Sequence, residues 1–321
     1  MPGWLAHPLQ LSTSGTVSSP LTLWRFCDGK PGHERQTAGL VAALESRTAL
    51  RVRTLRTEDI SWAPWHWLRA SWPEPAPEHP PDLIVGAGRA CQWPMLAAAR
   101  ALGGRSIYCM KPALPVRLFD LCLIPQHDNP RRGPHIEPTV GVLNDITLTG
   151  REPKTHCLIL VGGPSRHHGW DEATLLTQIE TVIARAEGPV MVGDSRRTPT
   201  RTRDALLRHL AQMPQAEVSF HAAEASPSDW LRRALSGART VWVTADSVSM
   251  IFEALTAGAG VGLLEVPRRR VDRITRLTDL LVHSGQITSF ADWQAGEILH
   301  APAPPLAEAA RCAELILERW S

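Results

Sequence analysis

The stretch that decides the fold lies at residues 240–267 and reads TVWVTADSVSMIFEALTAGAGVGLLEVP. An apolar run from Thr240 to Thr244 is followed by a polar turn, a short amphipathic stretch, a Gly-rich turn and a second apolar run. Short apolar runs bounded by turn residues indicate buried parallel strands, and the stretch between two of them indicates a crossover helix. The segment therefore predicts a strand–helix–strand unit of a parallel sheet.

Polar residues follow the first apolar run where this helix would begin. Ser247 and Ser249 would lie at its N-terminus, where free backbone N–H groups and the positive end of the helix dipole favour a phosphate. Glu253 follows on the second turn, within reach of ribose hydroxyls. The pattern favours a nucleotide with its pyrophosphate at the helix N-terminus. An ordinary N-cap at Asp246 or Ser247 is the alternative.

Short apolar runs alternate with longer amphipathic runs along most of the chain, which is typical of βαβ units. We expect an α/β protein with two Rossmann-like, doubly wound parallel-sheet domains that face a cleft. The expected bounds are a disordered leader at 1–20, a first domain at 21–150, a second at 151–300 and a C-terminal helix at 301–321. The expected strands are 21–27, 50–55, 83–85, 106–110 and 118–124, then 156–161, 189–192, 217–221 and 240–244, with a looser crossing stretch at 126–153.

Composition narrows the class of protein. Hydrophobic residues make up 43% and charged residues 21%, as in a folded globular chain with ample core. The net charge of +2 argues against a nucleic-acid partner. Six cysteines without a Cys-x-x-Cys pair indicate buried thiols in a reducing compartment. No apolar run reaches the length of a membrane span, so we expect a cytoplasmic protein, at most peripheral at the inner face of the membrane.

The first predicted strand runs into the loop DGKPGHERQ at 28–36. Two glycines let the backbone approach a ligand closely, and four ionisable side chains gather at one strand end. His33 is the first candidate for a general base and Asp28 the second, with Lys30 as a candidate phosphate contact. The alternative is a tight turn with a solvated His33.

The second half opens in the same way, with GGPSRHHG at 162–169. Backbone amides of Gly162 and Gly163 could hold a phosphate, with Ser165 beside it and Arg166 to neutralise it. The adjacent histidines of this loop point in different directions and have no acidic or thiol partner at ligand spacing, so no metal site is expected. Arg89 and Arg196 are further candidate phosphate contacts, for which solvated basic turns are the alternative.

Two stretches favour a surface role. Residues 61–72 hold four of the twelve tryptophans, which suits a membrane–water interface, or else a packed aromatic cluster. Residues 268–276 hold five arginines that could meet anionic lipid or a substrate phosphate, or else form a solvated helix face.

Several motifs, in order, resemble the ELM1 family, which is found in bacteria and in plant mitochondrial-fission proteins. The resemblance runs from about residue 21 to residue 293 and implies a GT-B glycosyltransferase-like architecture. By this likeness the helix with Glu253 would bind the nucleotide of a sugar donor, and the loop at 28–36 would face the acceptor. The motifs lie at 28–36, 88–89, 124–128, 141–144, 162–163, 195–199 and 246–250.

The residues and the resemblance together predict a nucleotide-sugar-dependent glycosyltransferase that acts on a lipid-linked or glycan acceptor of the cell envelope. The donor is a substrate, and neither a cofactor nor a metal is required. One alternative is a sugar-nucleotide epimerase of the same architecture. The other is a non-catalytic adaptor, since plant relatives are linked to the recruitment of a dynamin-like fission protein.

Overall fold

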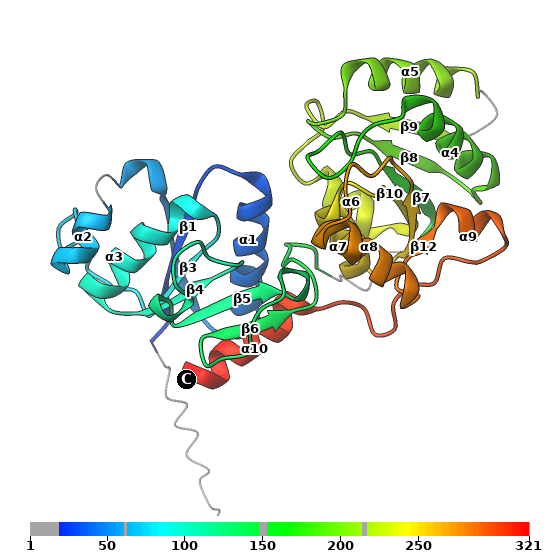
Figure 1. The fold of residues 1–321 in the computed structure, drawn as a ribbon. Coiled ribbons are helices and arrows are strands. Elements are labelled where there is room, and N and C mark those ends of the chain that lie inside the picture. The colour runs from blue at the N-terminus through cyan, green and yellow to red at the C-terminus, as the bar shows by residue number, and fades with distance from the viewer. Residues whose placement is uncertain (1–18, 61–62, 148–152, 214–216, 321) are drawn as a thin grey trace, which may run out of the picture.

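The computed structural model describes residues 19–60, 63–147, 153–213 and 217–320, and it has two six-stranded sheets with flanking helices (Figure 1). Every strand pair in both sheets is parallel. The predicted class, two Rossmann-like doubly wound domains, is confirmed. Residues 1–18 of the predicted leader lie outside the described residues.

The first domain has the strand order β2-β1-β3-β4-β5-β6. This order begins as in flavodoxin-like sheets. The second strand lies on one side of the first strand, and the third and later strands are added on its other side, so the switch point lies between β1 and β3. Its elements are β1 (Leu21–Cys27), α1 (Pro31–Glu45), β2 (Leu50–Arg56), η1 (Thr57–Asp59), α2 (Ala63–Arg69), β3 (Leu83–Gly86), η2 (Arg89–Cys91), α3 (Gln92–Leu102), β4 (Arg105–Tyr108), η3 (Val116–Leu118), β5 (Leu121–Pro125), η4 (Gln126–Asp128) and β6 (Ile136–Thr139).

The second domain has the order β12-β11-β10-β7-β8-β9, which is the Rossmann order with β7 as its first strand. Its elements are β7 (His156–Leu160), α4 (Glu172–Arg185), β8 (Val190–Gly193), α5 (Thr200–Ala211), β9 (Val218–His221), α6 (Trp230–Ser236), β10 (Ala238–Thr244), α7 (Val248–Thr256), β11 (Gly260–Leu264), α8 (Arg273–His283), β12 (Thr288–Ser289) and α9 (Phe290–Gln294).

Both sheets are covered on both faces, and their central strands are nearly continuous apolar runs. One apolar cluster lies on each face of each sheet. All six cysteines are free and buried. Burial raises the pKa of the Cys91 thiol to about 12, so this thiol is protonated and packs as a small apolar group.

The last helix, α10 (Glu308–Trp320), returns to the first domain (red in Figure 1). Cys312, Ala313 and Ile316 are buried in the same cluster as Leu40 and Leu44 of α1. The chain therefore crosses between the domains twice, and its final helix completes the core of the first domain.

The first crossing is held between α1 and α7. A Cβ on Gly39 of α1 would lie 1.9 Å from the carbonyl oxygen of Asn144, so only glycine permits this approach. The Asn144 amide donates to Thr256 Oγ1 of α7 at 3.0 Å. Asn144 thus lies at the point where helices of the two domains meet.

A second contact joins the domains beyond the carboxyl ends of their strands. Asp128 of η4, which follows β5, forms an ion pair with Arg273 at the start of α8. Helix α8 follows β11 in the second sheet. The carboxyl edges of both sheets are therefore turned toward the domain interface.

Within the described residues, no helix is long and apolar enough to cross a membrane.

Candidate functional site

The first part of the candidate site lies at the topological switch point of the first sheet, beyond the carboxyl ends of β1 and β3. His33 Nδ1 lies 2.8 Å from Asp28 Oδ2, and the Asp28 side chain is only 1% exposed. Gly88, after β3, has φ +91° and lies under this pair, since a Cβ there would be 2.3 Å from Asp28 Oδ2 and 2.4 Å from His33 Nδ1. The fold therefore brings two switch-point loops together around an Asp–His pair.

This geometry fixes the tautomer of His33. The Asp28 carboxylate can only accept, so Nδ1 carries the proton and Nε2 of the neutral ring is left as an acceptor. A carboxylate that orients an imidazole in this way is the arrangement found in general-base catalysis. Lys30 is 67% exposed, and its Nζ lies 3.8 Å from Asp28 Oδ2.

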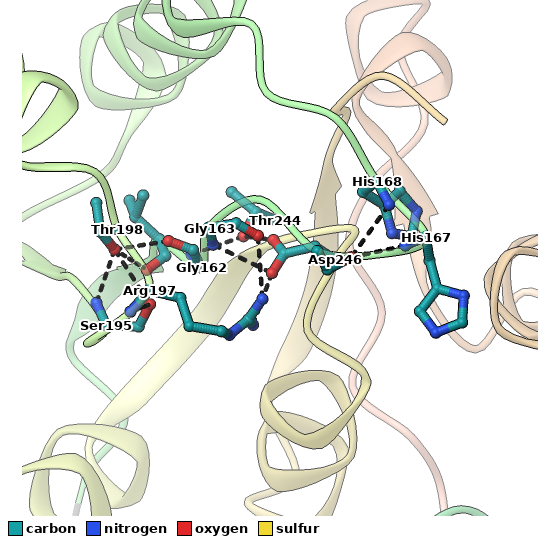
Figure 2. Close-up of polar contacts among 11 residues, drawn as sticks. Gly162, Gly163, His167, His168, Ser195, Arg197, Thr198, Thr244 and Asp246 are labelled. Atoms are coloured by element: carbon teal, nitrogen blue, oxygen red, sulfur yellow. Dashed lines mark hydrogen bonds and ion pairs between the residues drawn. The ribbon is translucent and has the colours of Figure 1, made fainter. Parts of the chain in front are cut away.

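The second part lies at the corresponding switch point of the second sheet, beyond β7 and β10 (Figure 2). The Gly162 amide donates to Thr244 Oγ1 at 2.8 Å, and the Gly163 amide donates to Asp246 Oδ2 at 3.1 Å. The amides predicted to hold a phosphate thus donate to side chains at the end of β10. A phosphate here would either replace these acceptors or bind at a neighbouring donor.

Arg197 is the cation that the fold brings to this loop. Its Nη2 lies 2.7 Å from Asp246 Oδ2, and its Nη1 donates to the Gly163 carbonyl at 3.0 Å. Thr198 fixes the same turn by donating to the Gly162 carbonyl at 2.6 Å (Figure 2). Arg197 remains 45% exposed, so its guanidinium retains donors for an anion.

Helix α7 begins beside this loop. Ser247 is its N-cap residue but makes no capping hydrogen bond through its side chain, and Ser249 on the first turn is exposed. The alternative of an N-cap at Ser247 is therefore met in position, but without the side-chain hydrogen bond of an ordinary cap. The first amides of α7 have no partner within the helix and remain available to an anion.

Glu253 on the second turn of α7 is 1% exposed and is reached from the first domain. Its Oε1 lies 2.6 Å from Nη1 of Arg35 on α1, whereas Oε2 is buried without a hydrogen-bond partner among the described residues. Burial raises the pKa of the Glu253 carboxyl, Arg35 opposes this shift, and Asp145 adds to it. The carboxylate thus has one oxygen paired and one oxygen free to accept.

The histidine pair of the 162–169 loop divides into two different environments. His167 Nδ1 lies 2.5 Å from Asp272 Oδ2 at the start of α8. His168 is fully buried, and neither ring nitrogen has a partner among the described residues. Burial lowers the pKa of His168, so its ring is neutral. Ser165 accepts from the backbone amides of both histidines at 3.1 Å and shapes this turn.

The three predicted arginines are exposed and do not bond to Asp246 or to the backbone of Gly162 and Gly163 as Arg197 and Thr198 do. Arg89 follows Gly88 in η2, Arg166 donates to His167 Nε2, and Arg196 precedes the bonded Arg197. Among the described residues, no three His, Cys, Asp or Glu side chains are grouped to hold a metal ion.

Four residues that organise the second switch point were not selected as site residues from the sequence, although Asp246 was named as a possible N-cap and two of the others lie in the motif at 195–199: Arg197, Thr198, Thr244 and Asp246. Thr244 and Asp246 flank the end of a predicted strand, which is the position from which side chains meet a neighbouring loop. That signal could have identified them. The choice of Arg197 over Arg196 depends on the direction of each side chain and has no signal in the sequence.

The tryptophan segment has packed and exposed members. Trp67 lies against Trp93, with ring centroids 5.4 Å apart, and Trp72 lies against Trp24 at 5.3 Å. Trp65 is 49% exposed and Leu68 is 60% exposed on α2. Residues 61 and 62 lie outside the described part of the chain.

The basic stretch at 268–276 is partly neutralised within the fold. Arg268 pairs with Asp279, Arg270 with Asp272 and Arg273 with Asp128. It therefore presents less positive charge than its sequence indicates.

The comparisons with known proteins agree with this architecture. The model of the family described as Mitochondrial fission ELM1 matches residues 31–320. A search of curated protein sequences finds no match.

Solved structures with the same arrangement of domains are remote in sequence. The chain is similar to MurG from Acinetobacter baumannii, with a TM-score of 0.51 and 12% identity, over 94% of this chain and 99% of that one. It is similar to a Listeria monocytogenes protein described as a putative UDP-N-acetylglucosamine 2-epimerase, with a TM-score of 0.54 and 11% identity, over 93% and 95%. It is also similar to the glycotransferase of kitacinnamycin, with a TM-score of 0.50 and 12% identity, over 94% and 99%. These likenesses show the fold, which is that of GT-B glycosyltransferases and epimerases.

Proposed function

The chain belongs to the mitochondrial fission ELM1 family, and from this premise we propose that it is a metal-independent, nucleotide-sugar-dependent glycosyltransferase. The observation that carries the proposal is the contact between α1 and α7. Arg35 of α1 and Glu253 of α7 form an ion pair. His33 lies two residues before Arg35, and Ser249 lies four residues before Glu253. Each is therefore within about 6 Å, along its own helix axis, of its member of the pair. A donor at α7 would therefore lie beside the Asp28–His33 pair.

On the donor side, the diphosphate would lie at the N-terminus of α7. Ser247, Ser249 and the first amides of the helix offer hydrogen bonds to it, and Arg197 supplies positive charge. Gly162, Gly163, Ser165 and Arg166 would form the opposite wall, with Lys30, Arg89 and Arg196 as further phosphate contacts. Oε2 of Glu253 is buried and unpaired, and it would accept from a ribose hydroxyl once neighbouring side chains move to admit the donor.

The chemical step needs a base on the acceptor side. His33 Nε2 would take the proton of the acceptor hydroxyl as the oxygen bonds to the anomeric carbon of the donor sugar. The bond from that carbon to the diphosphate oxygen breaks, and the nucleoside diphosphate leaves with the electron pair. Arg197 and the dipole of α7 would stabilise the negative charge on the leaving group. Asp28 would stabilise the protonated imidazole.

We further propose a lipid-linked or glycan acceptor of the cell envelope and a cytoplasmic protein with peripheral membrane contact. Trp65 and Leu68, which are exposed three residues apart on α2, support this contact because an amphipathic aromatic patch suits the membrane interface. The proposal keeps the expectation of no nucleic-acid partner, which rests on the net charge of +2.

Two other functions of the same fold remain as alternatives. An epimerase would convert a sugar nucleotide with no acceptor present, and the similarity to the Listeria monocytogenes protein supports keeping this candidate. A non-catalytic adaptor would not need the buried Asp28–His33 pair, whose presence favours an enzyme.

The decisive experiment is a thermal melt of the full chain with UDP-, GDP-, CMP- and dTDP-sugars. A ligand that binds only the native state, at about 100 times its dissociation constant, adds about 2.7 kcal/mol to stability and raises the melting temperature. We expect one nucleotide class to do so. Release of the nucleotide from that donor, as UDP, GDP or dTDP or as CMP from a CMP-sugar, only when glycan or glycolipid acceptors are added identifies a transferase. Conversion of the sugar alone identifies an epimerase, and no shift with any donor contradicts the proposal in favour of an adaptor.

A further inference from the structure

The feature that the proposed chemistry leaves unexplained is that the buried carboxylate of the second domain has its counter-charge in the first. Glu253 is 1% exposed and its Oε1 lies 2.6 Å from Arg35 Nη1. The two residues are 218 positions apart. A carboxylate buried to this degree needs a cation or several hydrogen-bond donors to remain charged. Here the cation is Arg35, which is 40% exposed on the other domain.

The charges that face Glu253 come from two elements. Burial raises the pKa of the Glu253 carboxyl. Arg35 on α1 lowers this pKa, and Asp145 in the crossing segment adds to the rise caused by burial. Without Arg35, both remaining influences would favour the protonated form. The protonated carboxyl loses acceptor capacity, and its proton can occupy the oxygen that now faces no partner.

The ion pair lies close to the segment through which the chain first crosses between the domains. Gly39 lies one turn along α1 from Arg35, and Asn144 fills the space between Gly39 and Thr256, which lies three residues after Glu253. Rotation of one domain about this segment would move atoms near it little. Arg35 and Glu253 are therefore among the groups of the two domains that such a rotation would separate least.

We propose that Arg35 is a positioning residue that keeps Glu253 ionised and leaves Oε2 free to accept from the ribose of a nucleoside diphosphate. The nucleotide affinity of the second domain thereby depends on a side chain of the first domain. The inference deepens the proposed function, on which its nucleotide part rests. The coupling between Arg35 and Glu253 can be tested without any ligand.

The first test measures unfolding free energy against pH for Arg35→Met, Arg35→Lys and Arg35→Met/Glu253→Gln. Methionine keeps an unbranched chain but removes the charge, whereas lysine keeps the charge. A carboxyl whose pKa is raised in the folded state stabilises the protein below its unfolded pKa, near 4.5, and this stability is lost as pH rises through the folded value. We expect Arg35→Met to lose stability over a wider range above pH 4.5 than the native chain. Adding Glu253→Gln should abolish that extra loss, and Arg35→Lys should resemble the native chain.

The second test titrates UDP, GDP, CDP and dTDP into the same variants and into Glu253→Gln by calorimetry at two pH values. If loss of Arg35 leaves one Glu253 in ten ionised, affinity for the bound nucleotide falls about tenfold, and it falls further at the lower pH. Arg35→Lys should restore most of the affinity. In the Glu253→Gln background, Arg35→Met should cause no added loss, because Arg35 acts through the carboxylate.

The outcomes separate the role of Arg35 in keeping Glu253 charged from the proposed binding of a nucleotide donor. An equal loss on Arg35→Met with and without Glu253→Gln would mean that Arg35 contacts the nucleotide directly, and it would overturn the inference. An unchanged pH dependence of stability in Arg35→Met would also overturn it. If the native chain binds none of the four nucleotides, the donor function fails, while the stability measurement still decides whether Arg35 keeps Glu253 charged.

Discussion

At the scale of single residues, the Asp28–His33 pair makes the sharpest chemical claim. We expect His33→Ala to lower turnover by roughly a hundredfold or more and to leave donor affinity nearly constant, because the imidazole moves a proton in the transition state and lies on the domain opposite the donor. Steady-state kinetics at saturating donor, with calorimetry for binding, measures both quantities. Poor donor binding with normal turnover at saturation would refute the role of His33 as base.

A matched control comes from the same domain. His79 has a side chain that is 45% exposed beside Glu78, away from the Asp28 carboxylate, so His79→Ala should leave turnover unchanged. Asp28→Asn tests orientation, because an amide can donate to Nδ1 and then favours the tautomer in which Nε2 holds the proton. It should reduce turnover and leave donor affinity unchanged.

Sequence reasoning could identify residues within one loop but not their partners across the molecule. Asp28 and His33 are five positions apart at a strand end, so their proximity follows from local structure. Arg35 and Glu253 are 218 positions apart and belong to different domains. Their pairing depends on how two separate sheets are set against each other, and hydrophobic periodicity carries no information on that arrangement.

At the scale of elements, the packing of the crossing segment against α1 depends on a missing side chain. Gly39→Ala would place a Cβ 1.9 Å from the Asn144 carbonyl oxygen, and backbone would have to move. We expect the free energy of unfolding to fall by about 1–3 kcal/mol in urea denaturation. Gly32, in the same helix, would meet nothing within 4 Å, so Gly32→Ala should leave stability unchanged or raise it by up to about 1 kcal/mol. Equal stability of the two variants would show that the segment does not press on α1.

Comparison of the predicted and observed strands shows that a continuous apolar run is enough to locate a strand buried on both faces. The apolar run at 21–27 coincides with β1, and the run at 240–244 lies within β10, because strands buried on both faces leave continuous apolar stretches. Strand β6 was missed inside the predicted crossing stretch. It contains Pro138 and lies at the edge of its sheet, where a missing N–H is tolerated, so its sequence resembles a loop.

At the scale of the whole molecule, helix α10 shows that the first domain is built from two separate parts of the chain. A sequence read from left to right predicts a helix that follows the second domain, whereas α10 packs on α1 in the core of the first. Apolar residues at helical spacing indicate that a helix buries one face but not which domain covers it. Two crossings rather than one therefore join the domains, which restricts their relative motion to movements that both crossings permit.

The distribution of exposed groups over the whole molecule also revises the expected membrane contact. Helix α2 belongs to the first domain, and the basic stretch before and within α8 belongs to the second (Figure 1). Three of the five arginines in that stretch are already paired within the fold. Reversible attachment through α2 would therefore depend mainly on Trp65 and Leu68, with Arg69 stacked 4.2 Å from the Trp65 ring centroid.

We accordingly expect the full chain to sediment with both neutral and anionic liposomes, with only a modest loss as salt is added, because apolar contact is not screened. A Trp65→Ala/Leu68→Ala variant should lose most of this binding. Leu280→Ala is the matched control, since Leu280 is 64% exposed on α8 of the other domain and should not contribute. Sedimentation that requires anionic lipid and disappears in salt would instead assign the contact to the arginines. Absence of sedimentation for the native chain at low salt would mean that Trp65 and Leu68 are ordinary surface residues and that the acceptor reaches the site from solution.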